Sequence, residues 1–263
     1  MKEIEKYVGY YLLVYLAVLA ICGFFQYMSV CQGKSLSCAF SMNGINTIIT
    51  TTAYVLTPIV AIVGFFSWKV QKQYDLQKEY AERILNLVNK ISIEINYIYS
   101  SFDTLKTMDN KVVALREESF FNSLNITNQL NAILIHVKTL EQIKSDSEIN
   151  LLFKHYEKNL LKLKTCLNII TDNYKEYYKL LPDKMKESKS STQYIARENY
   201  ELSIPFILAE AKLKRSLQEK IDIYEYNSNN IPLLYSEDLE TYKKNFDFHN
   251  NTFLKELIQI IKM

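Results

Sequence analysis

The sequence has little glycine, and all of it lies near one end. Its 263 residues include five glycines, and none follows Gly64. Phosphate-binding loops, dinucleotide fingerprints and nucleophile elbows need glycine where the backbone turns sharply or approaches a ligand. The two-residue turns of tight β-hairpins also favour glycine. We therefore expect the chain after residue 64 to be helical almost throughout and to lack the common nucleotide-binding and hydrolase loops.

Signatures of catalysis and of metal binding are absent from the sequence as well. His136, His155 and His249 have no second His or Cys at ligand spacing, and the four cysteines form no Cys-x-x-Cys pair. We expect a structural or solvent-exposed role for each histidine, no enzymatic activity, no metal and no cofactor. The formal net charge is only +2. A balance of this kind is not typical of a dedicated nucleic-acid binder.

Two long uncharged runs stand out in this otherwise polar chain. Residues 8–25 contain no charged side chain, and residues 48–68 form a second such run. Each run is close to the ~20 residues that a helix needs to cross ~30 Å of hydrocarbon. Acidic residues precede the first run and no small-residue cleavage site follows it, which argues against a signal peptide. The sequence predicts a two-span transmembrane hairpin over residues 1–68, with a short periplasmic loop at 31–46.

Basic residues at the ends of the two runs predict their orientation. Lys2 and Lys6 precede the first run, Lys69 and Lys72 follow the second, and the loop between them has only Lys34. Segments rich in lysine and arginine stay on the cytoplasmic side of a membrane. We therefore expect a multi-pass membrane protein with both termini in the cytoplasm. Aromatic and basic residues at the exit of the second run predict an interfacial anchor made of Phe65, Phe66, Trp68 and Lys69.

Small residues recur along one face of the second run, at spacings of three and four. Small residues let helix backbones approach closely in lipid. In one interpretation, this helix packs against the first span, which has its own small residues at Ala17, Ala20 and Gly23. In the other, it lines an oligomeric pore. In either case we expect Pro58 to kink this helix near mid-membrane. The candidate packing or pore residues are Thr50, Ala53, Thr57, Pro58, Ala61 and Gly64.

The predicted outer loop holds two of the four cysteines, Cys31 and Cys38. In an oxidising periplasm, two thiols in one short loop form a disulfide in one interpretation and remain free small residues in the other. Cys22 falls within the first span and Cys166 within a predicted cytoplasmic helix. We expect these two cysteines to serve only in packing.

Residues 69–263 show helical periodicity over long stretches. From Val70 to Leu105 the apolar residues alternate at spacings of four and three, interrupted only by Gln77. Such heptads favour long helices packed in a bundle, within one chain or between chains of a homo-oligomer. We expect the second span to continue as one helix into the cytoplasm. Further helices are predicted over 117–144, 147–181, about 204–226 and after Ser236. The predicted fold class is all-α, with the transmembrane hairpin followed by a cytoplasmic bundle of long antiparallel helices at 69–263.

Lysines gather on the helix predicted over 147–181. Lys154, Lys158 and Lys162 share one face, and Lys175 and Lys179 alternate with tyrosines. Such a surface suits contact with a partner or with nucleic acid, whose phosphates bind lysines and whose bases stack on aromatic rings. The alternative is a solvated helix face with the tyrosines in the core, which the apolar spacing favours.

Three predicted features follow one another along the chain. They are the two-span hairpin, the membrane exit with the sequence TPIVAIVGFFSWKVQKQYDLQKEY, and a helical body without glycine. In this architecture the chain resembles the two-transmembrane effectors that accompany retron reverse transcriptases in bacterial anti-phage defence loci. The resemblance covers mainly residues 8–100. It implies an effector that a cytoplasmic ribonucleoprotein, a reverse transcriptase with its nucleic acid, keeps silent until infection releases it to permeabilise the inner membrane.

The resemblance also implies different roles for the two parts of the chain. Thr50, Thr57, Pro58 and Gly64 belong to the membrane-active part, which works in the lipid bilayer, and the cytoplasmic helices form the control surface. The alternative function is a membrane-anchored scaffold or sensor that recruits a cytoplasmic partner and leaves the bilayer intact. A catalytic helical domain is a third interpretation, but no residue pattern supports it.

Overall fold

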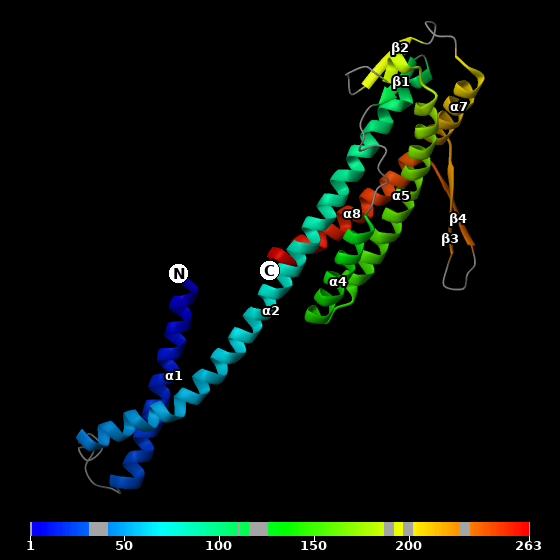
Figure 1. Ribbon diagram of the computed structural model, residues 1–263. Coiled ribbons are helices and arrows are strands. Elements are labelled where there is room, and N and C mark those ends of the chain that lie inside the picture. Colours follow the sequence, from blue (N-terminus) through cyan, green and yellow to red (C-terminus); the bar gives the residue numbers. More distant parts are fainter. Residues whose placement is uncertain are drawn as a thin grey trace. The chain divides into compact units, whose positions relative to one another are not determined.

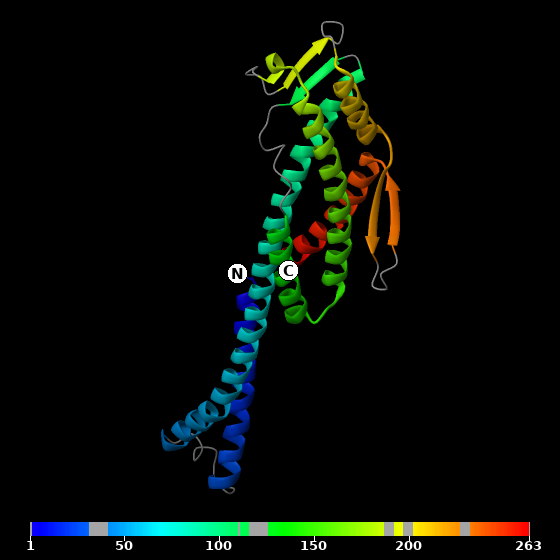
Figure 2. The same ribbon diagram turned by 45° about the vertical axis from the view of Figure 1, so that its right-hand side comes forward.

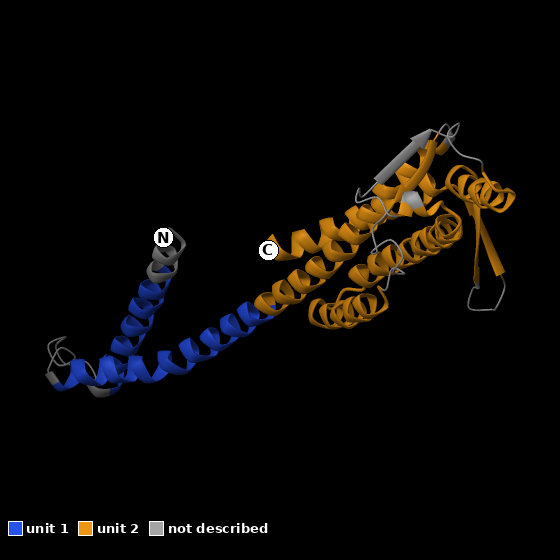
Figure 3. Cartoon of the chain, turned by 45° about the horizontal axis from the view of Figure 1, so that its top comes forward, with its two compact units in different colours: residues 1–73 blue, residues 74–263 orange. Residues whose placement is uncertain are grey.

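The computed structural model describes residues 2–31, 42–109, 111–115, 126–186, 192–196, 202–226 and 232–262. The chain divides into two compact units, residues 1–73 and 74–263 (Figure 3). The sequence predicts this boundary at 68/69. Helices make up most of both units, which confirms the predicted fold class in its coarse form.

The first unit contains two helices. Helix α1 spans Lys2–Gln26 and passes into a π-helical turn, η1, at Tyr27–Cys31. Helix α2 begins at Met42 and ends only at Leu105, so its residues after 73 belong to the second unit. By length and composition, two helices can cross a membrane, with their apolar stretches in Tyr10–Ser29 and in Asn43–Met108. The predicted pair of helices of membrane-spanning length is therefore confirmed.

Helix α2 is continuous over 64 residues although it contains Pro58. Proline removes one backbone hydrogen bond and its ring displaces the carbonyl four residues earlier, which bends a helix without necessarily ending it. Figure 2 shows a change of direction in the blue-to-cyan part of α2, which is the part of the sequence that contains this proline. The second apolar run and the heptads that follow it thus belong to one helix.

The second unit packs four long helical segments together (Figure 1). They are the later part of α2, α4 at Thr127–Lys144, α5 at Glu148–Lys179 and α8 at Leu239–Lys262. The shorter elements are η3 at Lys106–Asp109, α6 at Asp183–Lys186 and α7 at Ile204–Gln218. Helix α8 runs antiparallel to α5, since Phe153 contacts Phe253 near one end of the pair and Cys166 lies near Asp238 at the other.

The predicted heptad positions form the core of this unit. In α2, the apolar positions from Ala81 to Leu105 are buried, except that Ile98 is only partly so, whereas Val70 and Tyr74 are exposed. Burial of such a stripe is what stabilises an amphipathic helix in a bundle. The whole predicted face over 147–181 is buried, and all of it except Leu181 belongs to α5. It consists of Ile149, Phe153, Tyr156, Leu160, Leu163, Leu167, Ile170, Tyr174, Tyr177 and Leu181.

Four short strands depart from the predicted all-α fold. β1 at Lys111–Leu115 pairs antiparallel with β2 at Thr192–Ala196, and β3 at Ile221–Tyr226 pairs antiparallel with β4 at Pro232–Glu237. The prediction of helix up to residue 226 is wrong beyond Gln218. In β3, Ile221 and Ile223 are buried while Asp222 and Tyr224 are exposed, a period of two that marks a strand.

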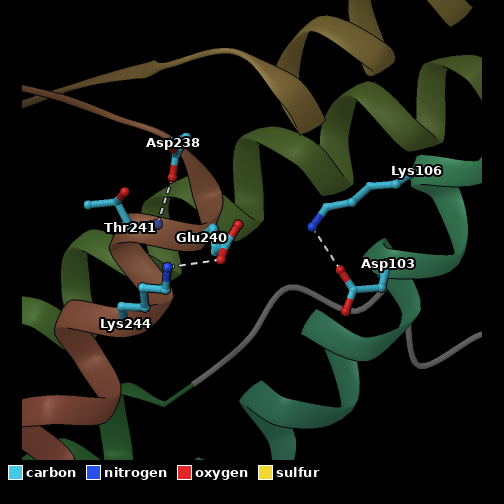
Figure 4. A network of polar contacts seen from close by, with 6 residues as sticks. All are labelled: Asp103, Lys106, Asp238, Glu240, Thr241 and Lys244. Atoms are coloured by element: carbon cyan, nitrogen blue, oxygen red, sulfur yellow. Dashed lines mark hydrogen bonds and ion pairs between the residues drawn. The ribbon is translucent and has the colours of Figure 1, made fainter.

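The last helix begins at Leu239, later than the predicted start directly after Ser236, because Ser236 lies in β4 opposite Asp222. The capping residue is Asp238, whose Oδ1 accepts a hydrogen bond of 2.7 Å from the backbone N–H of Thr241 (Figure 4). That hydrogen bond lowers the pKa of the Asp238 carboxyl. A carboxylate at this position also interacts favourably with the helix dipole.

Cys166 of α5 is fully buried, and burial raises the pKa of its thiol to about 12. Since the thiolate is the reacting species, we expect iodoacetamide at pH 8 to modify Cys166 about a thousandfold more slowly in the folded protein than in urea. Mass spectrometry of the peptide that contains Cys166 measures both rates on the same residue. Equal rates with and without urea would contradict the burial of this thiol.

Candidate functional site

In the first unit, α1 and α2 pack through a face of α2 whose residues recur every fourth position. Thr52 and Leu56 are buried on this face, and Gly44 lies on it two turns earlier. A Cβ atom added to Gly23 of α1 would lie 3.8 Å from Cδ1 of Ile48, which is ordinary van der Waals contact. The helices therefore approach closely at Gly23 without requiring a glycine there.

The predicted small-residue stripe lies beside this contact face, offset from it by one residue. It borders a groove of about 380 Å³ between the two helices. Gly64 lies apart, since no atom lies within 4 Å of the place that a Cβ would occupy. Thr50 is exposed, as are Ala17 and Ala20 of α1. The residues that line the groove include Ala53, Thr57 and Ala61 of α2 and Tyr11 and Tyr15 of α1.

Threonine hydroxyls in the apolar part of α2 bond to their own helix. Thr52 Oγ1 donates to the carbonyl of Ile48 and Thr57 Oγ1 to that of Ala53, each at 2.7 Å. Such bonds satisfy the hydroxyl in a medium that offers no water. These two side chains therefore require no water-filled channel and no second chain as a hydrogen-bonding partner.

The predicted interfacial anchor is exposed at the end of the apolar run. Phe65, Phe66 and Trp68 are each 59% exposed, and the ring centroids of Phe65 and Trp68 lie 6.0 Å apart. Lys69 follows them and is exposed as well. The possible disulfide between Cys31 and Cys38 lies outside what the structure describes, because Cys38 and the side chain of Cys31 are not among the described residues.

Two lysines of the predicted basic surface lie against the β3–β4 hairpin. Lys162 Nζ lies 3.1 Å from the centroid of the Tyr235 ring, and Lys158 Nζ lies 3.4 Å from a carboxylate oxygen of Glu225. Burial lowers the pKa of Lys162, whereas the hydrogen bond to Tyr235 raises the pKa of Lys158. Lys154 is exposed. Contacts within the fold thus engage two of the three lysines on this face.

The tyrosines that alternate with the later lysines lie in the core. Tyr174 and Tyr177 are fully buried, so neither ring can stack on a nucleic-acid base. Lys175 Nζ lies 3.5 Å from the Asp172 carboxylate. Lys179 is exposed, and its backbone carbonyl accepts a hydrogen bond from the Lys186 ammonium. The structure therefore does not join these lysines and tyrosines into one surface.

A polar network lies where the end of α2 meets the start of α8 (Figure 4). Lys106 Nζ contacts Asp103 at 2.8 Å, and Lys244 Nζ contacts Glu240 at 3.0 Å. Burial on its own would lower the pKa of Lys106, but the hydrogen bond to Asp103 and nearby negative charge raise it. Positive and negative groups alternate here, so the network pairs its own charges and offers no site of one sign to a ligand.

The structure brings two histidines together that sequence reasoning left apart. His155 of α5 and His249 of α8 have near-parallel rings whose centroids lie 5.6 Å apart. His136 instead lies against Tyr80, with centroids at 5.7 Å. In the part of the chain that the structure describes, no group of three or more His, Cys, Asp or Glu side chains is arranged to hold a metal ion.

Comparison with known proteins adds no relative to these observations. No protein-family model, no curated protein and no solved structure matches the chain.

Proposed function

We propose that the chain is a membrane-anchored bacterial effector, in which a cytoplasmic helical module controls an apolar hairpin in the inner membrane. The observation that carries this proposal is α2, one helix from Met42 to Leu105. Its early part is apolar enough to cross a bilayer, and its residues from Ala81 onward enter the core of the second unit. A change in the packing of that core therefore acts on the helix that also spans the membrane.

The outer surface of the hairpin supports placement in a bilayer. Large apolar side chains are exposed along α1 and η1 from Tyr10 to Met28 and along α2 from Ile45 to Val70. Water would penalise an apolar surface of this extent by roughly 25 cal/mol for each Å², whereas hydrocarbon accommodates it. Basic residues at the flanks favour cytoplasmic termini. The resemblance to retron-associated effectors adds a role in anti-phage defence, with a ribonucleoprotein as the restraining partner.

Overproduction without any partner tests this proposal. We expect the full chain to collapse the membrane potential of a bacterium, read with a potential-sensitive dye, and to arrest growth. Thr57→Leu fills the groove beside Tyr11 and Tyr15 and should weaken the effect, whereas Val63→Leu changes a side chain that is 62% exposed and outside the groove and should preserve it. Immunoblots of membrane fractions establish equal amounts of each protein.

The second candidate function is a non-toxic scaffold or sensor, and the threonine hydrogen bonds favour it. Because the Thr52 and Thr57 hydroxyls bond to their own helix, they do not give one hairpin a polar lining. A scaffold would leave both potential and growth unchanged at high membrane levels of the protein. That result would refute the effector proposal and leave the anchoring role in place.

A further inference from the structure

The pairing of His155 and His249 joins the two most closely associated helices of the second unit. Helices α5 and α8 share an aromatic interface, in which Tyr156 contacts both Phe246 and Phe253 at centroid distances of 5.9 and 5.4 Å. On α5, His155 directly precedes Tyr156 of this interface. On α8, His249 lies in the sequence between Phe246 and Phe253. Because the flanking aromatic residues are buried, the backbones that carry both imidazoles are held in place.

The separation of the two rings matches that of two imidazoles on one metal ion. With metal–nitrogen bonds of about 2.1 Å and a tetrahedral angle, the centroids of two coordinated imidazoles lie about 5.2 Å apart. The observed separation is 5.6 Å, with an angle of 12° between the ring planes. The side-chain torsion that turns a histidine ring is broad, and His155 is exposed. Its ring can therefore rotate to direct a nitrogen towards an ion that His249 also binds.

The residue type suits this chemistry, because a neutral imidazole donates the lone pair of a ring nitrogen to a metal ion. Imidazole nitrogen suits Cu²⁺, Ni²⁺ and Zn²⁺.

We propose that His155 and His249 together bind one divalent transition-metal ion, which links α5 to α8. Water completes the coordination, since the described residues supply no third histidine, cysteine or carboxylate to this pair. The proposed site lies within the second unit, and the result of its test does not depend on the effector function.

The test is Cu²⁺ binding to the purified full chain in detergent, after its accessible thiols have been alkylated. We expect one Cu²⁺ per chain and an electron spin echo modulation pattern typical of two coordinated imidazoles. His155→Ala and His249→Phe should each reduce that pattern to one imidazole or none and weaken binding by about tenfold or more. The phenylalanine keeps an aromatic ring in the stack and so preserves packing.

His136→Ala is the matched control, because it removes the only other histidine and should retain the two-imidazole pattern. Far-ultraviolet circular dichroism verifies that each variant is folded. A one-imidazole pattern in the unaltered protein would overturn the proposal. So would a two-imidazole pattern that survives in either variant at His155 or His249.

Discussion

Replacing Tyr174 and Tyr177 together with phenylalanine is expected to lower the free energy of unfolding by about 4 kcal/mol. Each hydroxyl serves both backbone groups of one residue in β1. Tyr174 Oη donates to the carbonyl of Leu115 at 2.7 Å and accepts from its N–H at 2.6 Å. Tyr177 Oη forms the same pair of bonds with Val113, at 3.0 and 3.2 Å.

The size of the expected loss follows from where these backbone groups lie. One edge of β1 pairs with β2, and residues two apart in a strand direct their backbone groups to the same edge. The backbone groups of Val113 and Leu115 therefore lie on the edge of β1 that faces α5 and that β2 does not cover. The two tyrosine hydroxyls bond to this edge as the backbone of a third strand would. Both residues are buried, so water does not replace the four lost hydrogen bonds, each of which costs at least about 1 kcal/mol.

Urea unfolding followed by circular dichroism measures this loss. Tyr224→Phe is the matched control, because it removes a hydroxyl from a side chain that is 64% exposed and should change stability by less than about 0.5 kcal/mol. Each single variant should lose about half of the effect of the pair. If the double variant were no less stable than the control, the hydroxyls would not be satisfying the edge of β1.

The same two tyrosines show how far the sequence predicts this fold. Their heptad spacing correctly predicts that both rings are in the core, because helical periodicity is a local pattern. Their hydrogen bonds to β1 are not predictable in this way, because the partners lie 59 and 64 residues away in a five-residue strand. Pairing of that kind depends on the tertiary arrangement, as does the meeting of His155 with His249.

In the first unit, the sequence predicts which residues share a face of α2 but not which face contacts α1. Spacings of three and four predict that Ala53, Thr57 and Ala61 share a face, and they do line one groove. The face of closest contact with α1 contains Thr52 and Leu56 instead, one residue earlier. Adjacent faces of a helix differ by only about 100° of rotation, so small residue size alone does not choose between them.

Removing the charge of Asp247 is the second substitution with a large expected effect. Lys243 Nζ donates to Asp247 Oδ1 at 2.6 Å, and the lysine side chain is only 11% exposed. The rings of Tyr99 and Phe246 lie 5.4 and 5.9 Å from the same ammonium. Asp247→Asn keeps the shape of the side chain but leaves a poorly hydrated positive charge without its partner, which should cost about 2–3 kcal/mol of stability.

A neighbouring ion pair on the same helix provides the control. Lys244 and Glu240 have the same spacing, but their side chains are 73% and 61% exposed, so Glu240→Gln should cost less than about 0.5 kcal/mol. The double variant Lys243→Met with Asp247→Asn removes both charges and should regain most of the loss.

Urea unfolding measures all three variants. Hydrogen exchange should show that α8 opens first, because Lys243 and Asn250 hold this helix beside Tyr99 and Ser92 of α2. Equal losses from Asp247→Asn and Glu240→Gln would mean that burial does not distinguish the two pairs.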